Sequence, residues 1–247
     1  MIEVRHFSYR YGNHQAVDDI SFDLKDGEIV SLIGPNGAGK STTMKVLTTL
    51  LRPCSGTIKI AGFDVLKQPN QARRFLGYLP ETNPLYTDML VYDALCATAA
   101  QRGIEKSKRE STIHAVAQQC GLNDVMHQTI ETLSKGYRQR IGIAQAILHD
   151  PAVLILDEAT TGLDPNQIRE IRDLIVQIGK KKTVLISTHI LQEVSAISDR
   201  VIIMNHGKIV CDGQLTSLLA NLSEQNQISK PTIEDLFTFY TSNPNHS

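Results

Sequence analysis

The sequence Gly34-Pro35-Asn36-Gly37-Ala38-Gly39-Lys40-Ser41 has the G-x-x-x-x-G-K-[ST] spacing of a phosphate-binding loop, which is the strongest indication of the fold. Its glycines permit backbone angles that a Cβ would forbid, so several N–H groups can converge on phosphate oxygens. We expect Lys40 to reach the β- and γ-phosphates of a nucleotide and the Ser41 hydroxyl to bind Mg²⁺.

The neighbouring sequence supports this interpretation over a chance glycine-rich turn. An apolar strand is expected at Glu28–Ile33, directly before the loop. A helix is expected from Ser41 onward, with Met44, Leu47 and Leu51 on one face, and its positive end would point at the same anion. The motif alone does not say which phosphoryl chemistry follows.

Strands and helices alternate in the last third of the chain. The expected elements are strands at 20–24, 28–33, 57–60, 152–156 and 183–187, helices at 89–101, 109–120, 165–179 and 190–197, and a hairpin of 201–204 with 208–211. Asp164 is the expected N-cap of the third of these helices. The pattern predicts a mixed α/β core with a helical insertion, followed by tail helices at 215–222 and 233–240 and a frayed end at 242–247.

Two acidic residues end an apolar strand, in Leu156-Asp157-Glu158. Asp157 suits a Mg²⁺ contact, direct or through water, and Glu158 can orient or deprotonate an attacking water. His189 follows the next strand and could bind a γ-phosphate or hold the carboxylate that activates the water. The plainer alternatives are two acids that only cap a strand and a histidine that is only polar.

Composition excludes several classes. The 25 Lys and Arg against 26 Asp and Glu give a net charge of −1, which lacks the basic excess of a general nucleic-acid binder. Four scattered cysteines, expected to be buried or half-buried thiols, form neither a disulfide framework nor a zinc site. No apolar run approaches the ~18 residues of a membrane span, and no signal peptide is evident, so a cytoplasmic location is expected.

The stretch Leu133-Ser134-Lys135-Gly136-Tyr137-Arg138-Gln139-Arg140 resembles the LSGGQ signature of ATP-binding-cassette (ABC) ATPases, with a helix expected at Ile141–Leu148. The phosphate loop, the signature, Asp157-Glu158, a D-loop at Gly162-Leu163-Asp164 and His189 occur in the family's order. The resemblance covers about residues 1–215, with a helical subdomain at about 88–150, and leaves 216–247 as a partly helical tail. It implies a P-loop ATPase cassette, with a mixed sheet core and an antiparallel β region.

The resemblance also implies roles for individual residues. ATP would lie between two copies, with Ser134 and Gly136 of one copy facing the γ-phosphate held by Lys40 of the other. Tyr11 is expected to stack on adenine, and Tyr9 is the alternative residue for this role. The other expected nucleotide contacts are the loop from Gly34 to Ser41, Thr42, Ser134, Gly136 and Asp164. The expected Mg²⁺ ligands are Ser41, Asp157 and Glu81, and the expected catalytic residues are Lys40, Glu158 and His189.

Several positions depart from the usual pattern. Glu81 stands where the Q-loop usually has Gln, and Lys135 and Tyr137 replace a Gly and a Gln of the signature. Glu adds a negative charge and, when ionised, loses the amide donor, which puts the Mg²⁺ contact in question. Ala159 stands where Pro often follows the catalytic Glu.

These departures are similar to a branch that includes gliding-motility and multidrug exporters, whose membrane subunits are separate polypeptides. The resemblance therefore implies an ATPase subunit that drives a separate permease at the inner face of the membrane, with export as the direction of transport in this branch. Its partners would be that permease and a second copy or a related cassette, with no nucleic acid. Tyr86, Met89 and Leu90 are candidates for the docking surface, and core packing is the equal alternative for each of them.

Three alternatives remain open. The first is a non-transport cytosolic ABC ATPase, although members of that kind carry two cassettes or a long coiled coil. The second is a regulatory module that binds ATP without hydrolysis, which the filled positions Glu158 and His189 argue against. The third is a kinase with the same loop, which would not need the stretch 133–136.

Overall fold

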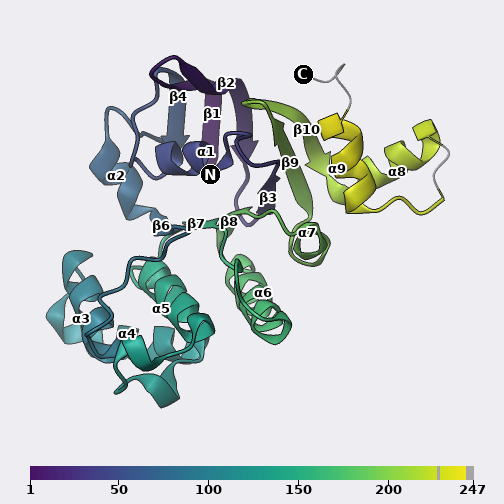
Figure 1. The fold of residues 1–247 in the computed structure, drawn as a ribbon. Helices are drawn as coiled ribbons and strands as arrows, with labels where there is room; N and C mark the ends of the chain where they lie inside the picture. The colour runs from purple at the N-terminus through teal and green to yellow at the C-terminus, as the bar shows by residue number, and fades with distance from the viewer. Residues whose placement is uncertain (227–228, 243–247) are drawn as a thin grey trace.

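Two β-sheets organise the computed structural model, which describes residues 1–226 and 229–242 (Figure 1). The smaller sheet is antiparallel, in the order β2-β1-β4-β5, with β1 at Ile2–Tyr11, β2 at His14–Leu24, β4 at Ser55–Ile60 and β5 at Phe63–Asp64. The larger sheet has the order β10-β9-β3-β8-β7-β6. Its strands are β3 (Ile29–Ile33), β6 (Leu76–Leu79), β7 (Val153–Asp157), β8 (Thr183–Ser187), β9 (Arg200–Asn205) and β10 (Lys208–Gln214).

The larger sheet is parallel except for its edge strand β10, and its central strands β3, β7 and β8 are buried at every residue. Such strands read as apolar runs because both faces are covered. The alternation along β7 shows this, since Val153 and Ile155 pack with the antiparallel sheet and Leu154 and Leu156 pack with the helical side. The mixed α/β core is therefore confirmed.

Helices cover both faces of this sheet. Helix α1 (Lys40–Leu47) lies between the two sheets, where Met44 and Leu47 join the core formed by β1, β3 and β4. On the other face, α6 (Pro165–Gly179) contributes Ile171, Leu174 and Ile175 to the second core. Helix α7 (Leu191–Ile197) follows β8 and precedes β9 in the chain.

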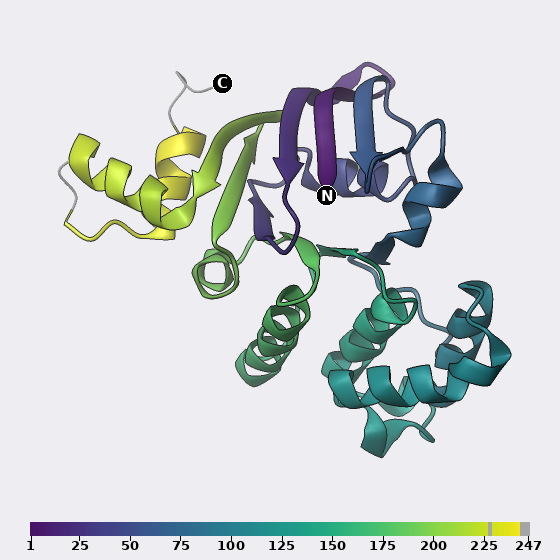
Figure 2. The ribbon, with the colours of Figure 1, turned by 180° about the vertical axis from the view of Figure 1, so that it is seen from behind.

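The expected helical block hangs below the larger sheet, well away from the antiparallel sheet (Figure 2). It consists of α3 (Val91–Gln101), α4 (Lys106–Cys120), 3-10 turns at Asn123–Val125 and Ile130–Thr132, and α5 (Lys135–Ile147). These helices share an apolar core with α6.

The expectation for α5 was wrong at its start, because the helix begins at Lys135 rather than Ile141. Ser134 caps it: the Ser134 hydroxyl accepts a hydrogen bond from the Tyr137 N–H. The signature is therefore the first turn of the helix. The sequence reading also missed β1, β5, β6 and the short helix α2 (Pro69–Arg74).

The tail forms α8 (Leu215–Asn226) and α9 (Ile233–Ser242), which pack against β9 and β10. Leu236 of α9 is buried with Val201 and Ile203 of β9. Of the end expected to fray at 242–247, Ser242 closes α9 and residues 243–247 lie outside the described part of the chain.

One expectation about the cysteines was wrong. Cys120 and Cys211 are buried and Cys96 is half-buried, but Cys54 is exposed because it follows α1 on a surface connection to β4. Within residues 1–226 and 229–242, no helix combines the length and apolar character that crossing a membrane requires.

Candidate functional site

The phosphate loop joins the end of β3 to the start of α1, as the sequence predicts. Gly37 and Gly39 have φ values of +81° and +103°, which a side chain would strain. A Cβ on Gly39 would also lie 2.5 Å from the Ala16 carbonyl oxygen of β2. The glycines therefore let the loop close tightly against the antiparallel sheet.

Lys40 is buried inside the loop. Its ammonium donates hydrogen bonds to the carbonyl oxygens of Gly34 at 2.7 Å and Pro35 at 3.1 Å. Desolvation lowers the Lys40 pKa, while the negative charges of Glu158, Asp157 and Glu81 act in the opposite direction. The charges of all three acids act on Lys40, so negative charge is concentrated at this end of the site.

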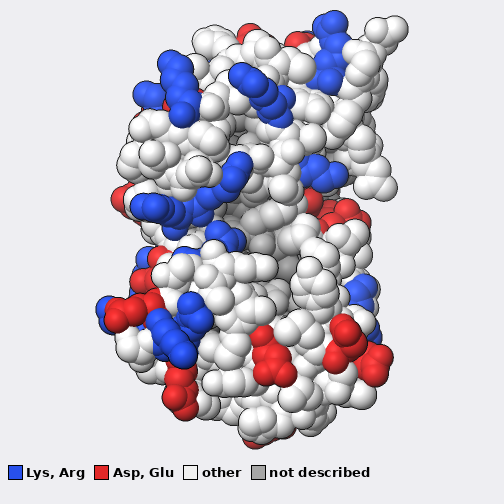
Figure 3. Space-filling model, turned by 90° about the vertical axis from the view of Figure 1, so that its left-hand side faces the viewer, with Lys and Arg blue, Asp and Glu red and all other residues white. Residues whose placement is uncertain are grey.

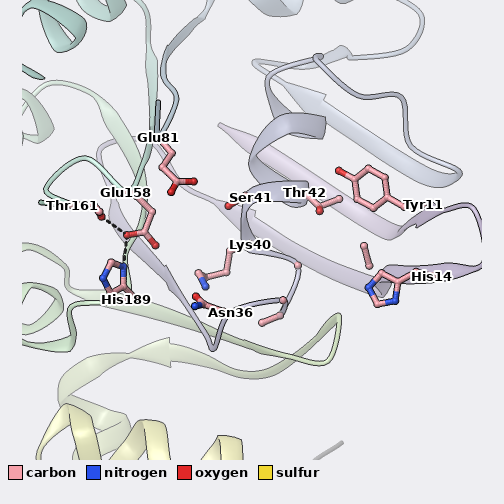
Figure 4. A pocket seen from close by; sticks show the side chains of 14 residues that line it. Tyr11, His14, Asn36, Lys40, Ser41, Thr42, Glu81, Glu158, Thr161 and His189 are labelled. Carbon is pink, nitrogen blue, oxygen red and sulfur yellow. Dashed lines mark hydrogen bonds and ion pairs between the residues drawn. The ribbon is translucent and has the colours of Figure 1, made fainter. Parts of the chain in front are cut away.

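A cavity of about 390 Å³ opens over the loop (Figure 4). Its lining comes from distant parts of the chain and comprises Tyr11, His14, Ala16, the stretch 36–42, Glu81, Glu158, Thr161 and His189. Of the residues predicted from sequence, it gathers Tyr11, Asn36 to Thr42, Glu81, Glu158 and His189. Gly34 and Pro35 serve instead as acceptors for Lys40.

His14, Ala16 and Thr161 are lining residues that sequence reasoning missed. His14 and Ala16 belong to β2, and no local motif marks them, because only the docking of the antiparallel sheet brings them to the loop. Thr161 lies three residues after Glu158, and its hydroxyl donates a hydrogen bond to the Glu158 carboxylate. This spacing between a carboxylate and a hydroxyl was the one feature of the sequence that could have indicated Thr161 as a lining residue.

Asp157 lies at the carboxyl end of β7 and is buried. The Asp157 Oδ1 accepts hydrogen bonds from two hydroxyl groups. One belongs to Ser41, at 3.5 Å, and the other belongs to Ser187 at the end of β8. Burial raises the Asp157 pKa, the Ser187 hydrogen bond opposes this, and the charge of Glu81 adds to the rise. The hydroxyl of Ser41 and the carboxylate of Asp157 thus meet at one point.

Glu158 is held in a strained conformation, with φ at +53°. Its backbone N–H donates to the Ser187 carbonyl oxygen at 3.1 Å, which fixes the turn. Its Oε2 accepts a hydrogen bond from the Thr161 hydroxyl at 2.9 Å and lies 2.6 Å from the His189 Nδ1 (Figure 4). The carboxylate therefore faces the cavity in one orientation.

The two rival tyrosines differ in position. Tyr9 packs partly against the core, whereas Tyr11 lines the cavity and is 46% exposed. Their rings meet edge to face with centroids 4.8 Å apart. This arrangement favours Tyr11 as the ring that is free to stack on a base.

The signature residues lie elsewhere. Ser134 and Gly136 line a separate cavity of about 380 Å³, beside Gln167 and Glu170 of α6. A Cβ on Gly136 would lie 2.9 Å from the Gln167 side chain, so glycine allows α5 and α6 to approach closely. Asp164 caps α6, accepting from the N–H groups of Asn166 and Gln167 at 3.0 Å each. One copy does not bring Ser134, Gly136 or Asp164 to its own phosphate loop.

A family model, individual sequences and solved structures all relate the chain to the ATP-binding proteins of ABC transporters. Residues 17–161 match the family model described as ABC transporter. The chain is 38% identical over 218 residues to the uncharacterized ABC transporter ATP-binding protein YxlF of Bacillus subtilis, covering 88% of this chain and 72% of that one. It is 36% identical over 212 residues to the bacitracin transport ATP-binding protein BcrA of Bacillus licheniformis, covering 85% and 68%.

A solved structure described as the ATP-binding subunit of an ABC transporter superposes with a TM-score of 0.85 at 29% identity. The superposition covers 97% of this chain and 99% of the solved chain. The expected cassette fold is thus confirmed along nearly the whole chain. The protein therefore belongs to the ABC transporter family, as an ATP-binding subunit with ATPase activity.

Proposed function

We propose that the chain hydrolyses MgATP between two cassettes and so drives a separate membrane permease in the direction of export. The observation that carries the two-cassette arrangement is the separation of the phosphate loop from the signature. Lys40 and Glu158 line one cavity, whereas Ser134 and Gly136 line another. A second cassette would supply the signature that a single chain keeps away from its own loop.

Lys40 would exchange its two loop carbonyls for β- and γ-phosphate oxygens when ATP binds. The ammonium is already aimed at the loop interior by Gly34 and Pro35, so the exchange requires no large movement. The N–H groups of residues 36–42 and the N-terminus of α1 would hold the remaining phosphate charge. Tyr11 would stack on the adenine.

The oxygen donors present fit Mg²⁺. Ser41 and Asp157 already lie together, and the charge of Glu81 reaches both Asp157 and Lys40. Hydroxyl and carboxylate oxygens are ligands that Mg²⁺ accepts, with phosphate oxygens completing the set. When bound, the ion would neutralise charge on the transferring phosphoryl group. Glu81 in place of Gln would add one negative charge to this set.

Glu158 would act as the general base toward water, and His189 would position it. The contact between His189 Nδ1 and Glu158 Oε2, reinforced by the Thr161 hydroxyl, supports this division of roles. Positioned proton transfer contributes about 10²–10⁴-fold to rate. Asp164, at the N-cap of α6, would face the second cassette across the dimer.

For the division of the chain, we propose a cassette at residues 1–215 with the helical subdomain at about 88–150 inserted in it, and a tail at 216–247. The shared core of α3, α4 and α5 supports the inserted subdomain. The packing of α8 and α9 on β9 and β10 supports a structural role for the tail.

The relative named for bacitracin transport supports a role in transport, and export is the direction that we propose for it. The docking surface for the permease would include Tyr86, whose side chain is 72% exposed. Met89 is a weaker candidate than Tyr86, because it packs partly on the core of the helical block, and Leu90 is half-buried. Through the permease, the chain would lie on the inner face of the cell membrane.

Mixed dimers test the two-cassette site. Lys40→Ala and Ser134→Arg chains should each be inactive alone, since each homodimer has two broken sites. A mixture should recover phosphate release, because a mixed dimer contains one site with an intact loop and an intact signature. A double variant carrying both changes, mixed with either single variant, provides the control without an intact site. Failure of the mixture to recover, in chains shown to pair, would contradict the shared site.

Affinity capture of the tagged chain from detergent-solubilised native membranes tests the permease. We expect a polytopic membrane protein to be recovered with it. Recovery of soluble partners alone, from a preparation that still hydrolyses ATP, would instead support a non-transport cytosolic ABC ATPase.

A further inference from the structure

A second charged cavity lies on the side of the molecule that carries α2 and α3. It measures about 510 Å³ and is lined by Asn70, Arg73, Arg74, Gln101, Arg102 and His149. None of these residues lines the nucleotide cavity. Figure 3 presents this side, with lysine and arginine side chains beside the hollow at mid-height.

The three guanidinium groups of this cavity have no carboxylate partner within residues 1–226 and 229–242. Among the described residues, no ion pair joins Arg73, Arg74 or Arg102 to a carboxylate. Desolvation lowers the Arg102 pKa, and no acidic neighbour opposes this shift in the part of the chain that the structure describes. The cavity lining contains no acidic residue, so it presents three positive charges to whatever enters.

Neutral contacts hold part of this arrangement in place. The Arg73 Nε donates to the Thr49 hydroxyl at 2.6 Å, and one of its terminal nitrogens donates to the Asn70 side-chain oxygen at 3.3 Å. These bonds orient the guanidinium without cancelling its charge. A guanidinium that is oriented beforehand loses less side-chain entropy when it binds an anion.

The pKa of His149 is sensitive to the positive charge of the cavity. Its Nε2 lies 2.9 Å from the Leu76 carbonyl oxygen and therefore carries the ring proton, while Nδ1 is buried without a hydrogen-bond partner. Desolvation, and then the charge of Arg102, lower its pKa to about 4. The imidazole is neutral at physiological pH and adds no charge to the three arginines.

We propose that this basic cavity, between α2, the end of α3 and His149, binds a phosphate-bearing anion. A single carboxylate would cancel one of the three charges, whereas phosphate groups carry multiple charges and match the guanidinium fork with paired oxygens. Two sources share this chemistry, a free polyphosphate or nucleotide and the headgroup of an anionic phospholipid.

Calorimetric titration with pyrophosphate tests the proposal, with the phosphate loop first saturated by ADP. We expect binding to the full-length protein and at least a roughly tenfold higher Kd for Arg73→Gln/Arg102→Gln, since this change removes two of the three guanidinium groups that would bind the anion. The variant Lys180→Gln/Lys181→Gln removes the same charge from an exposed run elsewhere and should bind as the parent does. All three proteins should keep the same thermal stability and ATPase rate.

The His149 ring gives an independent readout by nuclear magnetic resonance. A phosphate in the cavity should raise the His149 pKa above its value of about 4, because it offsets the charge of Arg102. His149→Gln identifies the resonance. An unchanged titration of this ring in the presence of bound pyrophosphate would place the anion elsewhere and overturn the proposal.

Vesicle flotation distinguishes the sources. Binding to phosphatidylglycerol vesicles but not to phosphatidylcholine vesicles, lost in Arg73→Gln/Arg102→Gln, would identify a lipid headgroup, while pyrophosphate binding alone would identify a free ligand. The proposal is overturned if neither probe binds, or if both charge variants lose binding equally. Tighter binding of a glutamate peptide than of pyrophosphate would overturn it in favour of an acidic protein segment.

Discussion

Glu158 combines a strained backbone conformation with a side chain that hydrogen bonds hold in one orientation. Its φ of +53° lies in the left-handed region, and the contacts with His189 and Thr161 hold its carboxylate at the cavity. Strain of this kind persists only where the surroundings over-determine it. Here the N–H bond to the Ser187 carbonyl provides that constraint.

Glu158→Gln should lower ATP turnover by about 10²–10⁴-fold, because the amide cannot accept a proton from water. ATP affinity should change little, since Lys40 and the loop are untouched. Steady-state phosphate release and equilibrium nucleotide binding, measured on one preparation, check both statements. Thr161→Val removes one contact to the same carboxylate oxygen and should cause a smaller loss. Turnover of Glu158→Gln equal to the parent's would show that another group is the base.

Asp157→Asn should raise the thermal stability of the nucleotide-free protein at pH 7 while abolishing Mg²⁺-dependent hydrolysis. Burial raises the Asp157 pKa above its unfolded value, so its contribution to stability is present at low pH and is lost as pH rises through the folded pKa. At pH 7, which lies above the unfolded pKa, the raised pKa of Asp157 therefore costs stability that asparagine would recover. Thermal unfolding across the acidic range checks this, and a lower midpoint for Asp157→Asn at pH 7 would contradict it.

At this scale the sequence predicts the residues whose spacing carries their chemistry. The loop 34–41 was predictable because one strand, one turn and one helix contain it. The cavity-lining roles of His14 and Ala16 were not predictable, because the docking of β2 creates them. The strain at Glu158 likewise depends on Ser187, 29 residues away.

Helix α5 connects the signature to the strand that leads to Glu81. The Asn83 side-chain amide donates to the Arg138 carbonyl oxygen of α5 at 2.7 Å, with Asn83 itself at φ +41°. A Cβ on Gly142 would lie 2.5 Å from both the Asn83 side-chain oxygen and a Leu79 methyl. Gly142 therefore sets how closely α5 approaches β6 and the residues after Glu81.

Gly142→Ala should destabilise the protein by about 1–3 kcal/mol through overpacking. Helix propensity alone would give the opposite sign, a gain of about 1 kcal/mol. Urea unfolding checks the sign. Adding Asn83→Ala should recover part of the loss, because one of the two clashing groups is removed. A stabilised Gly142→Ala protein would mean that α5 does not pack this closely.

Element boundaries show what a sequence pattern misses. The first turn of α5 contains Lys135, Gly136 and Arg138, so apolar periodicity begins only at Ile141, and the Ser134 cap sets the true start. Strand β6 has four residues and is recognisable mainly through its pairing with β7. Long amphipathic elements such as α6 were predicted to within a residue, because their pattern repeats over several turns.

For the whole molecule, the arrangement of cavities is the main constraint on mechanism. The phosphate loop lies under the antiparallel sheet, while Ser134 opens onto α6 on the helical side. The ordered set of motifs predicted the cassette, but only the assembled fold separates these cavities. That separation makes a pair of cassettes the expected active unit.

Sedimentation velocity of Glu158→Gln in MgATP tests this claim most directly, because blocked hydrolysis should hold the pair closed. We predict that Glu158→Gln is a monomer without nucleotide and with ADP, and a dimer with ATP. Adding Ser134→Arg to Glu158→Gln should prevent the ATP-dependent dimer. A preparation that binds ATP stoichiometrically and stays monomeric at all protein concentrations would contradict the shared site.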